Sequence, residues 1–296
     1  MEIEWSKWLR AIILHLEFLQ ETGVRYLPLS AEGVQLVEQL QYPYLSVSSN
    51  QMQRMSFSSS SEERPPTPSS QQLWGSEVLA RTPGEKQAAL EALRQRVLEC
   101  RKCEHLARSR THVVFGAGNP AADLMFVGEA PGVEEDRQGE PFVGAAGKLL
   151  TKVIETMGLS RDQVYIANVL KCRPDTPPGK PGNRKPTADE IIRCVPYLVE
   201  QIRIIQPKVI VALGATAVEG LLGRQAAAPG ILRLRGKWLE FQGIPLMPTY
   251  HPAFLLYNPT IQRKRELWED MLKVMERLGL PISEKQRNYF RKAAGQ

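Results

Sequence analysis

The sequence has few cysteines and few histidines, and it lacks a long uninterrupted apolar run. It contains 4 cysteines and 4 histidines in 296 residues. The apolar stretch from Leu9 to Leu19 is interrupted by Arg10, His15 and Glu17, and it is too short to cross a bilayer. No secretory leader is recognisable. We therefore expect a cytoplasmic protein, in which thiols stay reduced and disulfides are a disfavoured account of the cysteines.

Internal repeats are also absent, and the composition is that of a globular protein. Hydrophobic residues make up 43% of the chain, and its length suits one large α/β domain or a smaller domain with an appendage. The formal net charge of +6 weakly indicates an anionic partner, and nucleic acid is the first candidate.

The beginning of the chain differs in character from the rest. Within residues 1–45, Trp5, Trp8 and Ile12 stand at helical spacing, which predicts a small helical appendage. This appendage either packs within the protein or docks a repair or replication partner. Residues 46–84 are rich in serine and proline, and they have too few apolar side chains to offset the entropy lost on ordering. We expect a disordered linker there.

Strands and helices alternate over residues 85–296, which we expect to form the main domain. The alternation predicts a three-layer α/β/α sandwich, an α/β fold with a mostly parallel central sheet. The expected order is helix 85–100, strand 122–132, helix 147–159, strand 163–174, helix 187–207, strand and helix 207–222, strand and loop 244–256, and helix 262–279.

Polar residues follow three of the predicted strands. Glu129 comes after the first, Asn168 ends the second and His251 comes after the last. In parallel α/β sheets, ligands bind beyond the carboxyl ends of the strands. The sequence therefore predicts a site at this edge of the sheet.

Four strings in this part of the chain resemble the family 4 uracil-DNA glycosylases, the iron–sulfur members of the uracil-DNA glycosylase superfamily. They are VGEAPGVEEDRQGEPFVGAAGKLL, YIANVLKCRP, GNRKPTADEI and PTYHPAFLL, and the likeness runs from about Leu90 to Leu278. The resemblance implies an enzyme that flips uracil out of single- or double-stranded DNA and hydrolyses its N-glycosidic bond, leaving an abasic site. On this basis we expect a monomeric, monofunctional repair enzyme associated with the nucleoid.

The resemblance also assigns the four cysteines. Cys100 and Cys103 form a C-x-x-C pair before the first strand, Cys172 follows the strand that ends in asparagine, and Cys194 lies on the next helix. This order implies a [4Fe–4S] cluster held by four thiolates. A structural zinc site is the chemical alternative, and unligated core cysteines are the plainest one.

The same resemblance implies a pocket for the flipped base. The amide of Asn168 matches the N3–H donor and the O4 acceptor of uracil, and cytosine reverses that pattern. Phe142 is expected to stack on the base. His251, held extended by Pro252, is expected to donate to uracil O2 as negative charge develops there.

The loop after the first strand is expected to line this pocket and to hold the attacking water. Glu129 and Glu135 are the candidate carboxylates, and the choice between them stays open. Gly128 and Ala130 provide further contacts to the base. Asp136 is expected to have a structural role.

Basic residues near these motifs are candidates for contacts with the DNA backbone. They are Arg173, Lys180, Arg184, Lys185 and Arg263, together with Thr216 at the start of the helix that follows the third strand.

Two alternatives to a glycosylase that releases uracil remain. A related protein that traps uracil-DNA through a loop histidine is disfavoured, because GKPGNRKPT contains none. A non-catalytic nucleic-acid-binding module is the alternative from another class.

Overall fold

The computed structural model describes residues 82–174 and 183–290. The appendage expected over 1–45, most of the linker expected over 46–84, and Lys180 lie outside the described residues. Helix α4 (Pro83–Leu98) begins with a capping box in which Thr82 and Glu85 exchange hydrogen bonds. Helix α4 therefore begins two residues before the boundary expected at residue 85.

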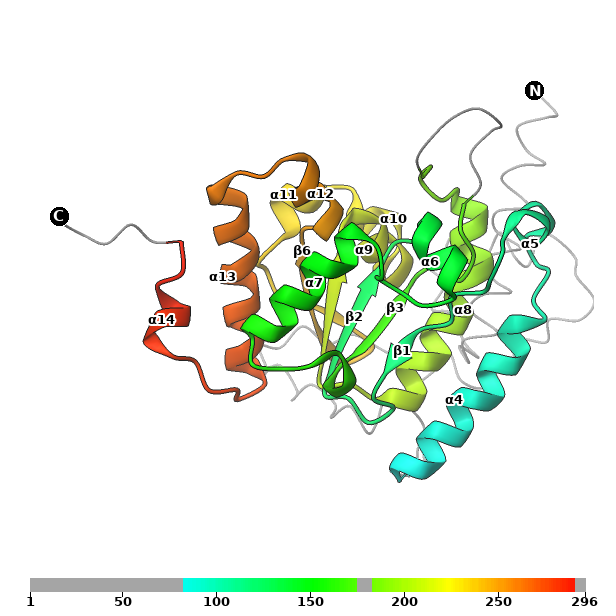
Figure 1. The fold of residues 1–296 in the computed structure, drawn as a ribbon, viewed down its shortest axis with the longest axis horizontal. Helices are drawn as coiled ribbons and strands as arrows, with labels where there is room; N and C mark the ends of the chain where they lie inside the picture. Colours follow the sequence, from blue (N-terminus) through cyan, green and yellow to red (C-terminus); the bar gives the residue numbers. More distant parts are fainter. Residues whose placement is uncertain (1–81, 175–182, 291–296) are drawn as a thin grey trace, which may run out of the picture.

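A six-stranded sheet forms the centre of the protein (Figure 1). Its strand order is β1-β3-β2-β4-β6-β5, with the four inner strands parallel and the two edge strands antiparallel to their neighbours. The mostly parallel sheet predicted from the sequence is confirmed. The strands are β1 (Ala117–Gly118), β2 (Leu124–Gly128), β3 (Tyr165–Asn168), β4 (Val209–Leu213), β5 (Leu239–Phe241) and β6 (Ile244–Thr249).

Helices cover both faces of this sheet. Figure 1 shows α13 and α14 on the left of the sheet and α4 and α8 on the right. Besides α4 the helices are α5 (Glu104–Ser109), α6 (Val133–Gln138), α7 (Ala145–Thr156), η2 (Arg161–Gln163), α8 (Ala188–Ile205), α9 (Ala215–Leu222), α10 (Arg224–Ala227), α11 (Ile231–Leu234), α12 (Pro252–Tyr257), α13 (Ile261–Arg277) and α14 (Glu284–Arg287).

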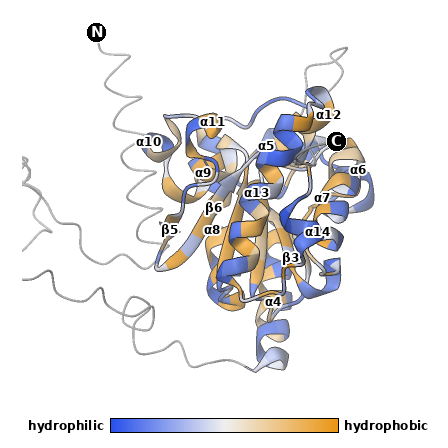
Figure 2. Cartoon of the chain, turned by 90° about the vertical axis from the view of Figure 1, so that its left-hand side faces the viewer, coloured by the Kyte–Doolittle hydropathy of each residue, from blue (hydrophilic) through white to orange (hydrophobic). Residues whose placement is uncertain are grey.

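Alternate side chains of the inner strands enter two separate cores. Met125 and Val127 of β2 join the core under α4, α8 and α9, whereas Leu124 and Phe126 join the core under α7 and α13. Every residue of β2, β3 and β4 is buried, as parallel strands covered on both faces require. Figure 2 shows the sheet mostly in hydrophobic colours between helices of mixed character. The three-layer α/β/α fold is confirmed.

Two segments differ from the expected elements. Strand β3 stops at Asn168 rather than continuing to 174, although the N–H groups of Val169 and Leu170 still donate to the carbonyls of Gly128 and Glu129. Residues 252–257, expected as a loop, form α12. The helix forms because a proline occupies its first position and the preceding histidine caps it. Within the described ranges, no helix combines the length and apolar character needed to cross a membrane.

Candidate active site and cysteine centre

The carboxyl ends of the inner strands bring the predicted polar residues to one edge of the sheet. Gly128 of β2 is in register with Asn168 of β3, and Leu213 of β4 is in register with Thr249 of β6. His251 follows Thr249 by two residues and precedes α12. In Figure 1, β2 points toward the upper edge, where α6, α9 and α12 gather.

Asn168 and Phe142 converge at Gly128. A Cβ atom at Gly128 would lie 2.4 Å from Asn168 Oδ1 and 2.5 Å from Phe142 Cζ, so only glycine permits this approach. The rings of Phe142 and His251 lie 5.6 Å apart between centroids, with 33° between their planes. The structure therefore brings three of the predicted base-contacting side chains into one small region.

Asn168 presents an unused acceptor in this region. The residue is 2% exposed, and its Oδ1 is buried without a hydrogen-bond partner among the residues described. Leaving such an acceptor unpaired costs about 1–3 kcal/mol. A functional site is the common place for an atom of this kind, because a ligand can supply the missing donor.

His251 is held as a neutral imidazole of defined tautomer. Its Nδ1 accepts a hydrogen bond of 3.2 Å from the backbone N–H of Ala253 at the start of α12. Burial lowers the pKa of His251 to about 4, although the charge of Glu135 acts in the opposite direction. The ring proton consequently lies on Nε2, which is available as a donor. Gly214, with φ of 92°, allows close approach, because a Cβ there would lie 3.2 Å from His251 Cβ.

Phe142 has an unusual backbone conformation that one arginine supports. It is buried, and its φ of 54° lies in the left-handed region that non-glycine residues rarely occupy. Arg161 donates to the carbonyl of Phe142 at 3.2 Å and to that of Pro141 at 2.8 Å, and it also reaches Thr151 Oγ1 at 3.2 Å. Arg161 lies outside the motifs recognised in the sequence, and no local pattern marks it.

The two candidate carboxylates have different surroundings. Glu135 accepts from the backbone N–H groups of Gly132 at 3.1 Å, Val143 at 3.0 Å and Gly144 at 2.9 Å. It joins the start of α6 to the loop that carries Phe142. The half-buried Glu129 carboxylate forms no hydrogen bond or ion pair with any described residue.

The neighbours of these carboxylates pack against the rest of the domain. Asp136 is buried and accepts from the N–H groups of Thr111 at 3.0 Å and His112 at 3.4 Å, which is the structural role expected for it. Ala130 packs against the core under α8. The loop after β2 is thus attached on both sides, and the side chain of Glu129 stays available.

The four cysteines line one hollow at the side of the domain. Cys100 follows α4, Cys103 caps α5, Cys172 follows β3 and Cys194 lies within α8; all four are free thiols. Arg110 Nη1 donates to the sulfur of Cys172 at 3.0 Å. No three cysteine, histidine, aspartate or glutamate side chains of residues 82–174 and 183–290 are grouped closely enough to hold a single metal ion.

Burial favours the protonated form of three of these thiols. Burial raises the pKa of Cys103 to about 11 and that of Cys194 to about 12, and it also raises the pKa of Cys172. Thiols in this environment keep their protons unless a metal group replaces them.

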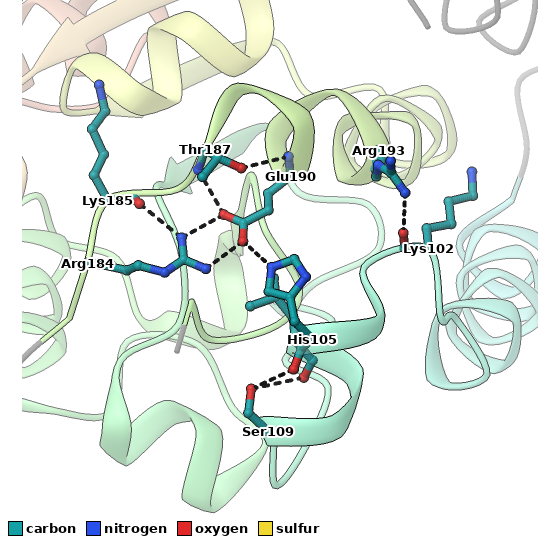
Figure 3. A network of polar contacts seen from close by, with 9 residues as sticks. Lys102, His105, Ser109, Arg184, Lys185, Thr187, Glu190 and Arg193 are labelled. Atoms are coloured by element: carbon teal, nitrogen blue, oxygen red, sulfur yellow. Dashed lines mark hydrogen bonds and ion pairs between the residues drawn. The ribbon is translucent and has the colours of Figure 1, made fainter. Parts of the chain in front are cut away.

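A buried carboxylate, Glu190, lines the same hollow as the cysteines, and Figure 3 shows its polar contacts. Glu190 is 2% exposed and receives hydrogen bonds from Arg184 at 2.6 and 2.9 Å and from Thr187 N at 2.8 Å, and it contacts His105 Nε2 at 2.7 Å. Burial opposes its charge, but the hydrogen bonds from Arg184, His105 and Thr187 outweigh burial and lower the pKa to about 2. Thr187 and Glu190 stand at the spacing of a capping box in the sequence, whereas nothing in the sequence indicates that Glu190 also contacts His105 of α5 and Arg184.

The candidates for DNA contact lie in different environments. Arg184 is engaged by Glu190, and Thr216 is only 3% exposed, so its hydroxyl is not presented to the surface. Arg173 donates to Asn183 Oδ1 at 3.3 Å, exposed Lys185 lies 3.5 Å from Glu219, and Arg263 lies 4.6 Å over the ring of Phe254 in α12. Lys180 is outside the described residues.

Comparisons with known proteins agree with this geometry. The family model of the uracil DNA glycosylase superfamily matches residues 115–272. The chain is 48% identical over 194 residues to the type-4 uracil-DNA glycosylase of Sulfurisphaera tokodaii, covering 64% of this chain and 84% of that protein. It is 42% identical over 196 residues to the type-4 enzyme of Archaeoglobus fulgidus, covering 64% and 94%. It is 30% identical over 193 residues to a type-5 uracil-DNA glycosylase of Pyrobaculum aerophilum, covering 55% and 82%. The chain belongs to the uracil-DNA glycosylase superfamily and, within it, to the type-4 family.

Proposed function

We propose that this protein removes uracil from DNA as a monofunctional glycosylase, with Asn168, Phe142, His251 and Glu129 as the residues that act on the base and the water. The observation that carries this proposal is the buried, unpaired Oδ1 of Asn168 at the point where Phe142 and His251 converge. The membership of the type-4 family supports the same activity.

Asn168 selects the base through its amide. Its Oδ1 receives the N3–H of uracil, and its Nδ2 donates to uracil O4. Cytosine has an acceptor at N3 and a donor at position 4. Its binding would therefore leave Oδ1 of Asn168 without a donor and place it against the N3 acceptor of the base. The selectivity thus depends on the unpaired acceptor that the structure displays.

Phe142 and Gly128 hold the flipped ring. The glycosidic bond cannot be approached while the nucleotide is stacked in the duplex, so the base must leave the helix. Stacking on an aromatic side chain contributes about 1–3 kcal/mol per base and offsets part of the unstacking. The missing side chain at Gly128 keeps the base edge close to Asn168.

His251 and Glu129 act on the bond that breaks. Water forms a bond to C1′ while the C1′–N1 bond breaks, and uracil leaves with the bonding pair as an anion. The Nε2–H of neutral His251 donates to O2, where the negative charge accumulates. The carboxylate of Glu129 forms no hydrogen bond or ion pair with any described residue. It receives the proton of the water and stabilises the positive charge that develops on the sugar. Glu135 acts as the support of the loop.

The four cysteines are proposed as the ligands of a [4Fe–4S] cluster. They surround one hollow, and the absence of a close group of three donors among the described residues favours a cluster over a single zinc ion. When bound, the cluster supplies metal–thiolate bonds that join the ends of α4 and α5 to β3 and α8. These bonds stabilise the segment that carries Asn168.

The proposal also covers the DNA contacts, the oligomeric state, the location and the partners of the enzyme. Arg173, Lys185 and Arg263 remain candidates for contacts with DNA phosphates, as does Lys180 on chemical grounds. The enzyme acts as a monomer on single- or double-stranded uracil-DNA in the cytoplasm, near the nucleoid. The N-terminal segment is proposed to dock a repair or replication partner, and removal of residues 1–80 should leave excision from naked DNA unchanged.

A labelled oligonucleotide with one uracil, beside a thymine control, tests the activity. Alkali should break the strand treated with purified protein at uracil alone, and Asn168→Ala should abolish this breakage. Asn119→Ala, at the opposite end of the sheet, is the matched control and should cleave like the unmodified protein. Equal binding of both strands without breakage would show a binding module, and a stable protein–DNA adduct would show covalent trapping; either result overturns the proposal.

A further inference from the structure

We propose that Lys171 is a positioning residue that connects the cysteine centre to the amide that reads uracil. This inference rests on the proposed function. Lys171 is 1% exposed, although lysine is among the residues least often buried. It stands between Asn168 and Cys172 in the sequence, and its backbone and side chain contact the surroundings of both.

The side chain of Lys171 is attached to the end of β3. Its Nζ donates to the main-chain carbonyl of Asn168 at 3.0 Å and to Oε1 of Gln201 at 2.5 Å. Its backbone N–H donates to the sulfur of Cys194 at 3.2 Å, and its carbonyl accepts from Val114 N at 2.8 Å. One residue therefore contacts both the peptide of the reading asparagine and a cysteine of the centre.

Gln201 keeps the ammonium group in place. It lies on α8, the helix that also carries Cys194, and it is fully buried. Its Nε2 donates to the carbonyl of Phe115 at 3.0 Å and to Tyr165 Oη at 3.2 Å. Because Nε2 is engaged on that side, Oε1 faces Lys171. The Lys171 side chain consequently has little freedom to leave the carbonyl of Asn168.

The charge of Lys171 has no carboxylate partner in the part of the chain that the structure describes. A buried charge without a counter-charge is strongly unfavourable. Cys172 is the neighbour of Lys171 in the chain, and the sulfur of Cys194 accepts from the backbone N–H of Lys171 at 3.2 Å. As ligands of a cluster, these two thiolates would supply the missing negative charge close to the ammonium group.

The segment held by Lys171 also carries the pocket loop. Val169 and Leu170 donate their N–H groups to the carbonyls of Gly128 and Glu129, at 3.0 Å in each case. A shift at residues 168–171 therefore moves the amide of Asn168 and the backbone of Glu129 together. Displacements of about 1 Å in a reacting site can reduce the rate by about 100-fold.

Two substitutions separate the hydrogen bond from the charge. Lys171→Met has a similar shape and lacks both the donor and the charge, whereas Lys171→Gln keeps a neutral donor. The matched control is Lys208→Met, which removes an exposed lysine paired with Asp123. For each protein we would measure kcat and KM on uracil-DNA, the inhibition constant of free uracil, the iron content, and the reduction potential of the cluster.

Lys171→Met should weaken free-uracil inhibition and lower kcat/KM by about tenfold or more while iron content is retained. Its reduction potential should fall, because a buried positive charge next to the cluster is lost. Lys171→Gln should show the same fall in potential but regain part of the uracil binding. Lys208→Met should change none of these quantities.

An unchanged inhibition constant and an unchanged potential in Lys171→Met would overturn the proposal. If that variant does not fold, Lys171→Gln decides alone. If neither folds while Lys208→Met does, Lys171 is required for folding, and its positioning role is also rejected. A wild-type protein that excises no uracil would refute the proposed function. The reduction potentials of wild type and Lys171→Met would still test whether Lys171 is coupled to the cysteine centre. If the wild-type protein contains no iron, kcat/KM on uracil-DNA and the inhibition constant of free uracil decide the proposal.

Discussion

The guanidinium of Arg161 donates to the main-chain carbonyl of Phe142, 3.2 Å away, and so supports a left-handed backbone conformation at the residue proposed to stack on uracil. Such conformations persist where the surroundings hold them, and they are frequent at functional sites. The carbonyl of Pro141 is held by the same side chain at 2.8 Å. The orientation of the stacking ring therefore depends on a residue outside the recognised motifs.

Removal of this support should reduce activity more than stability. Arg161→Met leaves the carbonyl of Phe142 without its donor, so kcat/KM for uracil-DNA should fall by about tenfold or more. Steady-state kinetics with a uracil oligonucleotide measure this change. Arg94→Met, at an exposed position of α4, is the control and should behave like wild type. Equal kcat/KM for both variants would show that Phe142 does not need this support.

The activity should not follow the ordinary titration of histidine. Burial lowers the pKa of His251 from 6.5 to about 4, so the ring stays a neutral donor through the range in which an exposed histidine would gain a proton. The pH profile of kcat/KM should consequently show no step near 6.5 due to this residue and a decline toward pH 4. A decline centred near 6.5 that disappears in His251→Gln would contradict this prediction.

The lowered pKa of His251 also makes the free energy of unfolding depend on pH. Between about pH 6.5 and 4 the unfolded chain protonates His251 while the folded protein does not, so the unfolded state binds more protons. The stability contribution of neutral His251 is complete above pH 6.5 and is lost as the pH falls toward 4. The free energy of unfolding of His251→Gln should therefore depend less on pH in this window than that of wild type. Parallel denaturant titrations at several pH values measure the difference.

The two loop carboxylates should respond differently to the same substitution. Glu129→Gln should lower kcat with little change in the melting temperature, because no described residue depends on its charge. Glu135→Gln replaces an acceptor of three backbone N–H groups and should cost about 1–3 kcal/mol of stability. Thermal unfolding and single-turnover kinetics separate the effects. If the outcomes were exchanged, Glu135 would be the residue that acts on the water.

Arg110 should tune the cysteine centre. Its guanidinium donates to Cys172 Sγ at 3.0 Å and to the carbonyl of Leu98 at 3.2 Å. Hydrogen bonds to ligand sulfurs raise the reduction potential of a cluster, so Arg110→Met should lower it and increase the loss of iron during purification. Arg108→Met, two residues before Arg110 and in the last turn of α5, removes a side chain paired with exposed Glu104 and should leave both unchanged. Equal potentials in the two variants would contradict this role.

Most of the fold could be predicted from the chain because burial leaves a direct trace in the sequence. Strands β2 and β4 are buried on both faces and appear as continuous apolar runs. The capping box of Thr187 and Glu190 marks the start of α8. Strands β1 and β5 have 2 and 3 residues and too little periodicity to be recognised. The turn into α12 was missed because its proline also suits a loop.

The sequence by itself determined the residue types of the site, since Asn168, His251 and the four cysteines stand in motifs whose chemistry is specific. Only the tertiary structure decided how they are held. It assigned Glu135 to the loop, left Glu129 available, placed Arg161 on the carbonyl of Phe142, and buried Lys171 between β3 and α8. These contacts join segments that are distant in the chain and use common residue types. Their partners are defined only when the strands and helices pack, so no local pattern announces them.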